Sequence, residues 1–330
     1  MKNNNEFNSF MIKSFRTDDE SVIKGTKKIR YHYTSPSAFL SIIDKRQIRF
    51  TDIRYLNDKS EGVYLIKLII NFFEKYKNEY QYSRELFFNL IKLHSIKELE
   101  ELNVTKIDYN MPIPYMERRL FVFCLSAKQD SLNMWNYYVN NGNYQGYNIG
   151  FSVNKFLKTF DINVDKFIDP FTVYYGDVLY KEAEQYKEIK SFFDLIEKKL
   201  SKSHTKQECD YFLIQIRNYI ESNEAFFKNP AFESEKEFGI VIEIADERVH
   251  RPKNNYAGKN NKQIEDEFTV KNGLIVPFLL VKFDCDAITN VTISPITEFG
   301  IAKESVKELL ENKIGCNIEV KKSDMPIRFK

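Results

Sequence analysis

The sequence lacks the patterns that mark secreted, membrane-spanning and zinc-binding proteins. Its four cysteines, at positions 124, 209, 285 and 316, are scattered without a CxxC pair, and its four histidines are equally dispersed. No apolar run approaches the roughly 18 residues needed to span a bilayer, and the N-terminus has no signal-peptide pattern. We therefore expect a cytoplasmic protein with free thiols and no zinc site of local spacing.

An excess of one charge and the common catalytic motifs are also missing. The chain has 49 basic and 47 acidic residues, and a net charge of +2 gives no general argument for binding nucleic acid or membranes. There is no Walker A sequence, GxSxG elbow, HExxH helix or EF-hand loop. Any active site must therefore be assembled from residues that are far apart in the sequence.

The composition is that of a globular protein. Hydrophobic residues make up 43% and charged residues 29% of the 330 positions, with 28 Phe, 20 Tyr and one Trp. No internal repeat or low-complexity linker divides the chain. We predict a flexible arm over residues 1–27 and one α+β domain over 28–330, with a central mixed or antiparallel sheet. Helical insertions are expected near residues 62–118 and 181–228.

Hydrophobic periodicity places the individual elements. A helix is expected after Ser35 as N-cap and Pro36, with Phe39, Leu40 and Ile43 directed inward. A short helix follows Ser131, and Asp246–Asn272 is predicted as a long charged loop. Strands are predicted at residues 28–33, 47–51, 120–125, 147–153, 172–178, 238–244, 276–282, 288–293 and 317–320. Further helices are predicted at 63–76, 82–102, 181–201, 205–227 and 302–312.

An acidic cluster precedes the strand predicted at residues 238–244. Glu233, Glu235 and Glu237 alternate along the chain, and alternate residues of an extended segment point to one face. Two carboxylates crowded on one face favour a shifted pKa and hence acid–base or electrostatic chemistry. The plain alternative is a solvated strand edge whose charges discourage aggregation.

The remaining candidate residues are distributed along the chain, and each also has a plain explanation. A histidine in a strand, such as His32, is more often a hydrogen-bonded core residue than a catalytic group. A lone tryptophan on a helix, such as Trp135, is usually packing. The other candidates are Tyr55, Asn57, Asp58, Glu61, Ser126 and Tyr138.

Several stretches together resemble the bacterial domain-of-unknown-function family 2971. They are the run Phe121–Ser126, the helix with Met134, Trp135 and Tyr138, the stretch Phe226–Glu237, and a polar loop with Asn57, Asp58 and Glu61. The similarity extends over about residues 29–296. Members of the family usually carry arginine or a similar residue two positions after the last glutamate of the cluster, where this chain has Gly239. The family name implies no activity.

A second resemblance is to the first strand of ADP-ribosyltransferase folds. It rests on the run Tyr31-His32-Tyr33-Thr34, followed by a helix capped by Ser-Pro and a short strand. The resemblance implies that His32 and Thr34 bind the nicotinamide ribose of NAD. The separation between His32 and Glu237 exceeds that of a minimal domain of this fold, so helical insertions must be assumed.

The same resemblance assigns the remaining roles. Glu237 would be the catalytic glutamate that orients the ribose 2′-hydroxyl, with Glu235 as its neighbour and His32 completing the catalytic set. Tyr55 or Trp135 would stack on the nicotinamide ring. The other expected binding residues are Asn57, Ser126 and Tyr138.

These patterns predict an NAD-using ADP-ribosyltransferase or NAD glycohydrolase, of the kind found among bacterial toxins and phage-defence effectors. NAD would be the substrate, and a protein or nucleic acid the acceptor. One alternative is a non-catalytic nucleotide or nucleic-acid binding module, which the basic loop 246–263 favours. Another is a metal-dependent nuclease that uses Asp58, Glu61, Glu235 and Glu237, although the expected lysine is missing from the acidic strand.

Overall fold

The computed structural model describes residues 28–56, 63–93, 118–139, 144–160, 171–245, 264–271, 273–315 and 317–327. The chain forms two compact units. The helical unit contains the described residues 63–93 and 178–233, and the sheet unit contains the others. The sequence predicts one domain with two helical insertions. These insertions supply the helical unit, and each unit has a hydrophobic core of its own.

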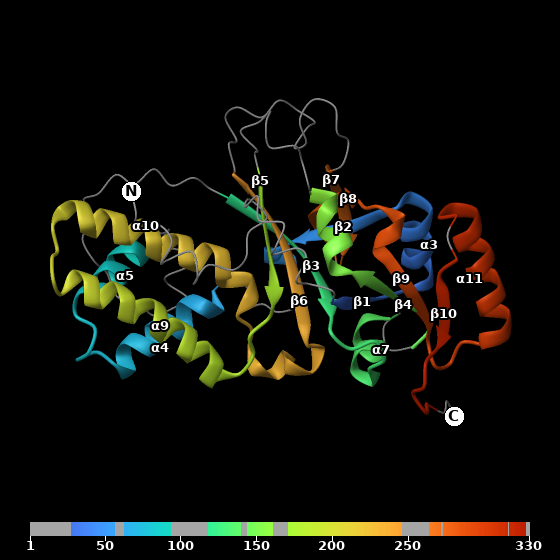
Figure 1. The fold of residues 1–330 in the computed structure, drawn as a ribbon, viewed down its shortest axis with the longest axis horizontal. Helices are drawn as coiled ribbons and strands as arrows, with labels where there is room; N and C mark the ends of the chain where they lie inside the picture. Colours follow the sequence, from blue (N-terminus) through green and yellow to red (C-terminus); the bar gives the residue numbers. More distant parts are fainter. Residues whose placement is uncertain are drawn as a thin grey trace. The chain divides into compact units, whose positions relative to one another are not determined.

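Four amphipathic helices build the helical unit (Figure 1). They are α4 (Tyr64–Lys75), α5 (Tyr82–Leu93), α9 (Glu182–Leu200) and α10 (Lys206–Asn223). Their apolar faces meet in an aromatic core in which Phe192 stacks on Tyr219 with ring centroids 4.0 Å apart. The Glu197 carboxylate of α9 accepts a 2.8 Å hydrogen bond from Ser83 N at the start of α5. Favourable charge at a helix N-terminus thus adds to apolar burial in holding this unit together.

The sheet unit is organised around the nine-residue strand β3 (Arg118–Ser126). Along one edge β3 pairs with β6 (Glu237–Ala245), which pairs in turn with β5 (Phe171–Asp177). The other edge of β3 is shared by β1 (Ile29–Thr34) at Ser126 and β2 (Gln47–Asp52) at Phe121 and Val122. The sheet therefore divides at β3 into two arms.

One arm continues from β1 to β4 (Tyr147–Ser152), β9 (Ile288–Ile293) and β10 (Glu319–Lys322). The other continues from β2 to β8 (Leu274–Lys282) and β7 (Ile264–Lys271). The β9–β10 pair is parallel, and the other pairs among the described strands are antiparallel. The described strands thus form a mixed ten-stranded sheet, as expected for the predicted α+β class.

Both arms contribute to one large apolar core, which three helices help to build. They are α3 (Pro36–Lys45), α8 (Val153–Leu157) and α11 (Phe299–Lys313). α3 begins as predicted, with Ser35 accepting a hydrogen bond from Ala38 N and Pro36 in the first turn. Ile42, rather than Leu40, is buried with Phe39 and Ile43. Leu40 is exposed because the apolar stripe of this helix is narrower than the sequence pattern suggests.

The stretch predicted as a charged loop contains a strand. β7 occupies Ile264–Lys271 and pairs with β8 along its whole length. Three consecutive acidic residues hide the strand pattern in the sequence, because the pattern is clear only from Phe268 onward. The helix predicted at 82–102 is described over Tyr82–Leu93, and its predicted end and the arm 1–27 lie outside the described residues. The other element bounds agree with the predictions to within a few residues. None of the described helices has the length and apolar character that crossing a membrane requires.

Candidate active site

The register of three strands decides which candidate residues share a face of the sheet. Tyr31 of β1 lies opposite Ser126 of β3, and Ser126 lies opposite Glu237 of β6. Directly paired residues point to the same side, and neighbours along a strand point to opposite sides. Tyr31, Ser126 and Glu237 therefore project from one face, which we call the acidic face. His32 projects from the other face.

Side-chain contacts confirm this division. On the acidic face, the Tyr33 ring meets Trp135 edge-on at a centroid distance of 4.8 Å. On the opposite face, the His32 ring lies 5.1 Å from Phe123, which belongs to the large apolar core. The Arg30 guanidinium, two residues before His32, lies over the Phe238 ring of β6.

His32 is thus half-buried against the apolar core rather than a neighbour of Glu237, which corrects the sequence-based assignment. Burial lowers the pKa of His32 to about 4, although a hydrogen bond to the Cys124 backbone partly opposes the shift. The ring is therefore neutral at physiological pH. Thr34 lies on the same side as His32 and is 5% exposed. Neither side chain projects toward the acidic cluster.

The two glutamates come from different local structures but remain close to one tyrosine. Glu235 ends the 3₁₀ helix η6 (Pro230–Glu235), and Glu237 begins β6. Lys236 between them has a φ of 48°, a left-handed conformation that is costly for a residue with a side chain. This turn leaves both glutamates buried, at 8% and 5% exposure. The sequence-based prediction places both glutamates on one continuous extended segment, but Glu235 belongs to the 3₁₀ helix and not to the strand.

Tyr138 is bonded to Glu235 and lies close enough to Glu237 for the charge of that carboxylate to act on it. It ends the helix α7 (Leu132–Tyr138), and its hydroxyl donates a 2.8 Å hydrogen bond to Glu235 Oε1. Burial, followed by the negative charges of Glu235 and Glu237, raises the pKa of Tyr138 well above its usual value. The phenol therefore stays protonated and acts as a hydrogen-bond donor within a buried acidic group.

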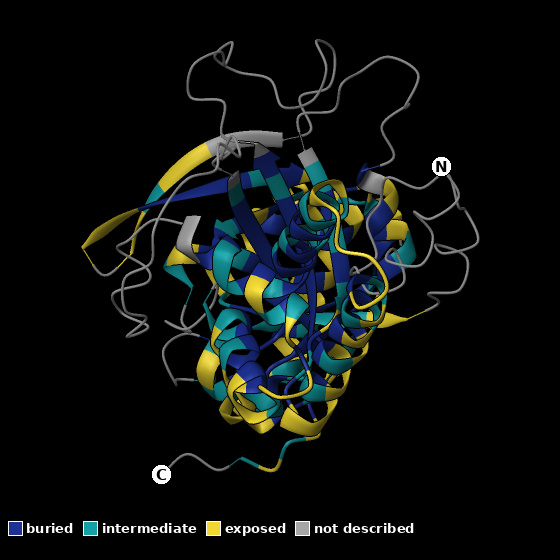
Figure 2. Ribbon diagram, turned by 90° about the vertical axis from the view of Figure 1, so that its left-hand side faces the viewer, coloured by how far each residue is buried: buried dark blue, intermediate teal, exposed yellow. Residues whose placement is uncertain are grey.

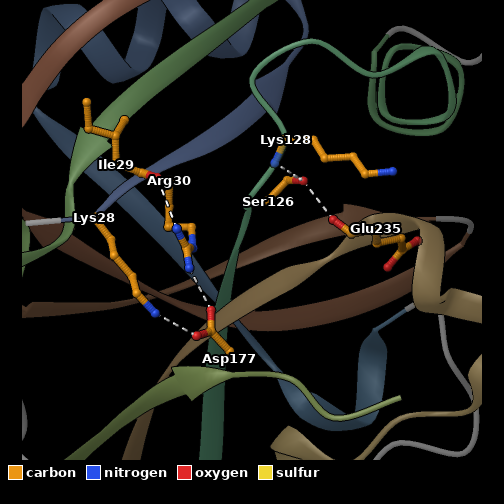
Figure 3. Close-up of polar contacts among 7 residues, drawn as sticks. All are labelled: Lys28, Ile29, Arg30, Ser126, Lys128, Asp177 and Glu235. Atoms are coloured by element: carbon orange, nitrogen blue, oxygen red, sulfur yellow. Dashed lines mark hydrogen bonds and ion pairs between the residues drawn. The ribbon is translucent and has the colours of Figure 1, made fainter. Parts of the chain in front are cut away.

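Ser126 holds the backbone beside this group. Its Oγ donates a 2.7 Å hydrogen bond to the Glu235 carbonyl and accepts one of 3.1 Å from Lys128 N, as Figure 3 shows. Ala127 N donates a further 2.8 Å bond to the Lys236 carbonyl. Ser126 is 1% exposed. It therefore positions the turn that carries the glutamates, rather than presenting its hydroxyl to a ligand.

Two glycines lie next to the glutamates on the acidic face. Gly239 lies two residues after Glu237, opposite Cys124 of β3 on one side and Gly176 of β5 on the other. Neither glycine carries a side chain. Glycine in a strand often marks a place where a ligand or another backbone comes close.

Trp135 packs within the protein instead of stacking on a ligand. It is fully buried, and its indole N–H donates a 2.6 Å hydrogen bond to Asp130. Asp130 also accepts bonds from Ser323 Oγ at 2.8 Å and Asp324 N at 2.7 Å, which connects the C-terminal segment to α7. This plain explanation was one of the two that the sequence allowed.

Tyr55 lies far from the acidic pair along β3. It belongs to the short 3₁₀ helix η1 (Ile53–Tyr55), which directly follows β2 at the Phe121 end of β3. The distance from Phe121 to Ser126 along an extended strand is roughly 17 Å. Asn57, Asp58, Glu61 and the basic loop 246–263 lie outside the described residues.

Sequence reasoning missed three residues that the structure brings to this face. Tyr31 projects beside Ser126, and its hydroxyl contacts Gln129 Oε1 at 3.4 Å. Asp130 anchors Trp135, and the backbone of Lys236 makes the turn between the glutamates. For Tyr31, the alternation of the predicted first strand offered a signal, because only one of Tyr31 and His32 can share a face with Glu237.

This segment of the chain also has a match among known families. Residues 134–240, which extend from α7 to β6, match the model of a family described as protein of unknown function, DUF2971. The chain is similar to that family over this segment, which is less than half of its 330 residues. The matched segment contains Tyr138, Glu235 and Glu237. No curated protein and no solved structure matches the chain.

The described residues contain no cluster of three or more His, Cys, Asp or Glu side chains placed to hold a metal ion. The nuclease alternative would also use Asp58 and Glu61, which the structure does not describe. The acidic-x-Lys spacing of some metal-dependent nucleases occurs at Glu188/Lys190 and Glu197/Lys199, but both pairs lie on the helix α9 rather than on a strand.

Proposed function

We propose that the protein cleaves a glycosidic bond at the acidic face, with NAD as its substrate. The observation that supports this most directly is the pair of buried carboxylates, Glu235 and Glu237, around the Tyr138 hydroxyl. Cleavage of a glycosidic bond passes through a cation-like state at the sugar carbon, which a desolvated carboxylate stabilises strongly. NAD follows from the resemblance of the first strand to ADP-ribosyltransferases and remains part of the proposal.

The contacts of each residue suggest its role. Tyr138 bonds to the Glu235 carboxylate and Ser126 bonds to the Glu235 backbone carbonyl, so Glu235 is the positioning carboxylate. Glu237, at the start of β6 and next to the bare backbone at Gly239, is the carboxylate that faces the ribose. Tyr31, rather than His32, is the first-strand residue that contacts the substrate. Trp135 has a packing role that holds α7, and therefore Tyr138, in place.

The chemical step is a substitution at C1′ of the nicotinamide ribose. The bond from C1′ to the ring nitrogen breaks, and its electron pair returns to the ring, so that neutral nicotinamide leaves. Water or an acceptor group forms the new bond to C1′ and loses one proton, which a carboxylate takes up. Hydrolysis converts NAD⁺ and water into ADP-ribose, nicotinamide and a proton. Transfer replaces the water with a side chain or a nucleotide group.

Nicotinamide release from NAD tests the proposal. We expect release by the wild-type protein, with or without an added protein or nucleic-acid acceptor, and a strong loss in Glu237→Gln. Glu243→Gln is the matched control, because it makes the same change on the same strand, six residues away. Wild-type protein that releases no nicotinamide, or a Glu237→Gln variant that releases as much as wild type, would disprove the proposal.

A further inference from the structure

β7 presents an open strand edge. It is the last strand of its arm, so one of its edges has no strand partner among the described residues. The pair Lys271–Leu274 closes a two-residue turn to β8. In such a turn the closing pair is hydrogen-bonded and the next pairs alternate, so the backbone groups of Phe268 and Val270 point away from β8. These groups are available to another strand.

The same hairpin exposes apolar side chains. Phe268, Val270 and Ile275 are 68%, 75% and 69% exposed. Val270 pairs with Ile275, and Phe268 pairs with Pro277, so these side chains share one face of the hairpin. Figure 2 shows exposed positions in yellow, and they include this end of the hairpin. An exposed apolar edge strand favours association with another strand.

The sequence of β7 is complementary to itself in one antiparallel register. If two copies pair about Thr269, Phe268 of each copy lies opposite Val270 of the other, on the apolar face. Glu267 of each copy then lies opposite Lys271 of the other, on the second face, and both side chains are exposed. Centring the pairing on Glu267 instead would set two glutamates against each other.

Hydrogen-bonding geometry selects the same register. Phe268 and Val270 have their backbone groups at the open edge, so the pair that they form across two copies exchanges both N–H···O bonds. Thr269 on the two-fold axis forms the intervening pair without hydrogen bonds. Backbone bonds, apolar pairs and charge pairs therefore agree in this register.

We propose that two copies of the chain associate through their β7 strands, antiparallel and centred on Thr269, so that two sheets become one. The proposal commits to a second copy because charge and apolar complementarity occur together in the strand itself. It does not depend on the proposed glycosidic-bond chemistry, since none of the residues at the acidic face belongs to β7.

Charge reversal tests the register. Glu267→Lys and Lys271→Glu each convert two attractive contacts into two repulsive ones, and each should weaken dimerisation at least about tenfold. An equimolar mixture of the two variants restores opposite charges at both contacts and should dimerise like wild type. The measurement is sedimentation velocity on the full chain between about 1 and 100 μM. Single variants that dimerise as well as wild type would overturn the proposal.

A backbone test complements the charge test. Val270→Pro removes an N–H that points away from β8, so the fold should persist while dimerisation is lost. Ile301→Thr, at a 74% exposed position of α11, is the control and should leave the dimer intact. Wild-type protein that is monomeric at about 100 μM overturns the proposal. So does monomeric protein that binds phospholipid vesicles through this hairpin, which would assign the patch to a membrane.

Discussion

The two faces of β1, β3 and β6 use neighbouring residues for opposite purposes. On one face His32, Phe123 and Phe238 belong to or border the large apolar core, and burial keeps the imidazole neutral. On the other face, Glu235 and Glu237 are buried around a tyrosine hydroxyl. One residue along a strand separates the two environments.

This difference indicates that one face of the sheet unit contributes mainly to stability and the other mainly to the proposed chemistry. The apolar face gains free energy by burying hydrocarbon. The acidic face costs free energy, because it desolvates two carboxylates and holds Lys236 in a left-handed conformation. A protein keeps such a costly arrangement when it contributes to function, and substitutions on the two faces should therefore have different consequences.

The largest expected effect is a difference in nicotinamide release between substitutions on the two faces. Glu237→Gln should lower nicotinamide release about 10³-fold, because an amide provides no charge opposite the cation-like state. His32→Gln should keep the rate per folded molecule within about threefold, since the ring projects away from the substrate. Both rates are measured at saturating NAD, with the folded fraction determined by circular dichroism. A folded His32→Gln variant without activity would show that the face assignment is wrong.

The sequence predicted much of the fold because local signals agreed with it. The Ser35–Pro36 start of α3 and the apolar run of β3 were both apparent from residue type and spacing. β7 was missed because its acidic first half resembles a loop. The stretches predicted as helical insertions, 62–118 and 181–228, contain α4, α5, α9 and α10. That they form a compact unit with its own core depends on long-range contacts, which periodicity does not encode.

The candidate site was only half predictable. The acidic pair and Tyr138 were both named as candidates from the sequence, but the first-strand candidate, His32, projects from the face opposite to Glu237. To choose between Tyr31 and His32, one must know the register in which β1 pairs with β3, and the paired residues are over 90 positions apart in the sequence. A shift of one residue exchanges the two faces, so a sequence motif in a strand does not by itself show which side chains share a face with Glu237.

The second prediction concerns the stability of the apolar face. The pKa of His32 is lowered from 6.5 to about 4 in the folded protein, so the unfolded chain binds a proton first as the pH falls. The contribution of His32 is fully present above pH 6.5 and is lost as the pH falls toward 4. It amounts to about 3 kcal/mol at most, because the residue as a whole is only half-buried.

Urea denaturation at pH 7.5 and pH 4.5 measures this effect. The free energy of unfolding should fall less between the two values in His32→Gln than in wild type, because glutamine does not titrate. Other groups contribute equally to both proteins and cancel in the comparison. Identical pH dependence in the two proteins would contradict the burial of an uncharged imidazole.

The third prediction concerns the Tyr138 hydroxyl, which donates a hydrogen bond to Glu235. Tyr138→Phe removes the donor to Glu235 and should lower kcat about tenfold, with little change in fold. Tyr137→Phe makes the same change at a 68% exposed neighbour on α7 and should have no effect. The comparison is a steady-state measurement of kcat and KM. Equal kcat for both variants would remove Tyr138 from the proposed site.

The smallest expected effect tests whether the C-terminal segment supports the acidic face. Ser323→Ala removes the hydroxyl that donates to Asp130 and accepts a 3.2 Å bond from Met325 N, and it should cost about 1 to 2 kcal/mol of unfolding free energy. Trp135 is the only tryptophan in the sequence, so its fluorescence reports on this cluster alone. We expect stronger quenching by acrylamide in the variant than in wild type, and a small decrease in kcat as α7 loosens.

Ser305→Ala is the control for this change, because in the described part of the chain its hydroxyl donates to backbone carbonyls of its own helix α11. It should leave the fluorescence and kcat unchanged. If Ser323→Ala is less stable but has wild-type quenching and kcat, the C-terminal segment adds stability without positioning α7. The acidic face would then depend on two hydrogen bonds to Glu235, one from Ser126 of β3 and one from Tyr138 of α7. These bonds would hold the costly turn at Lys236 without help from the C-terminal segment.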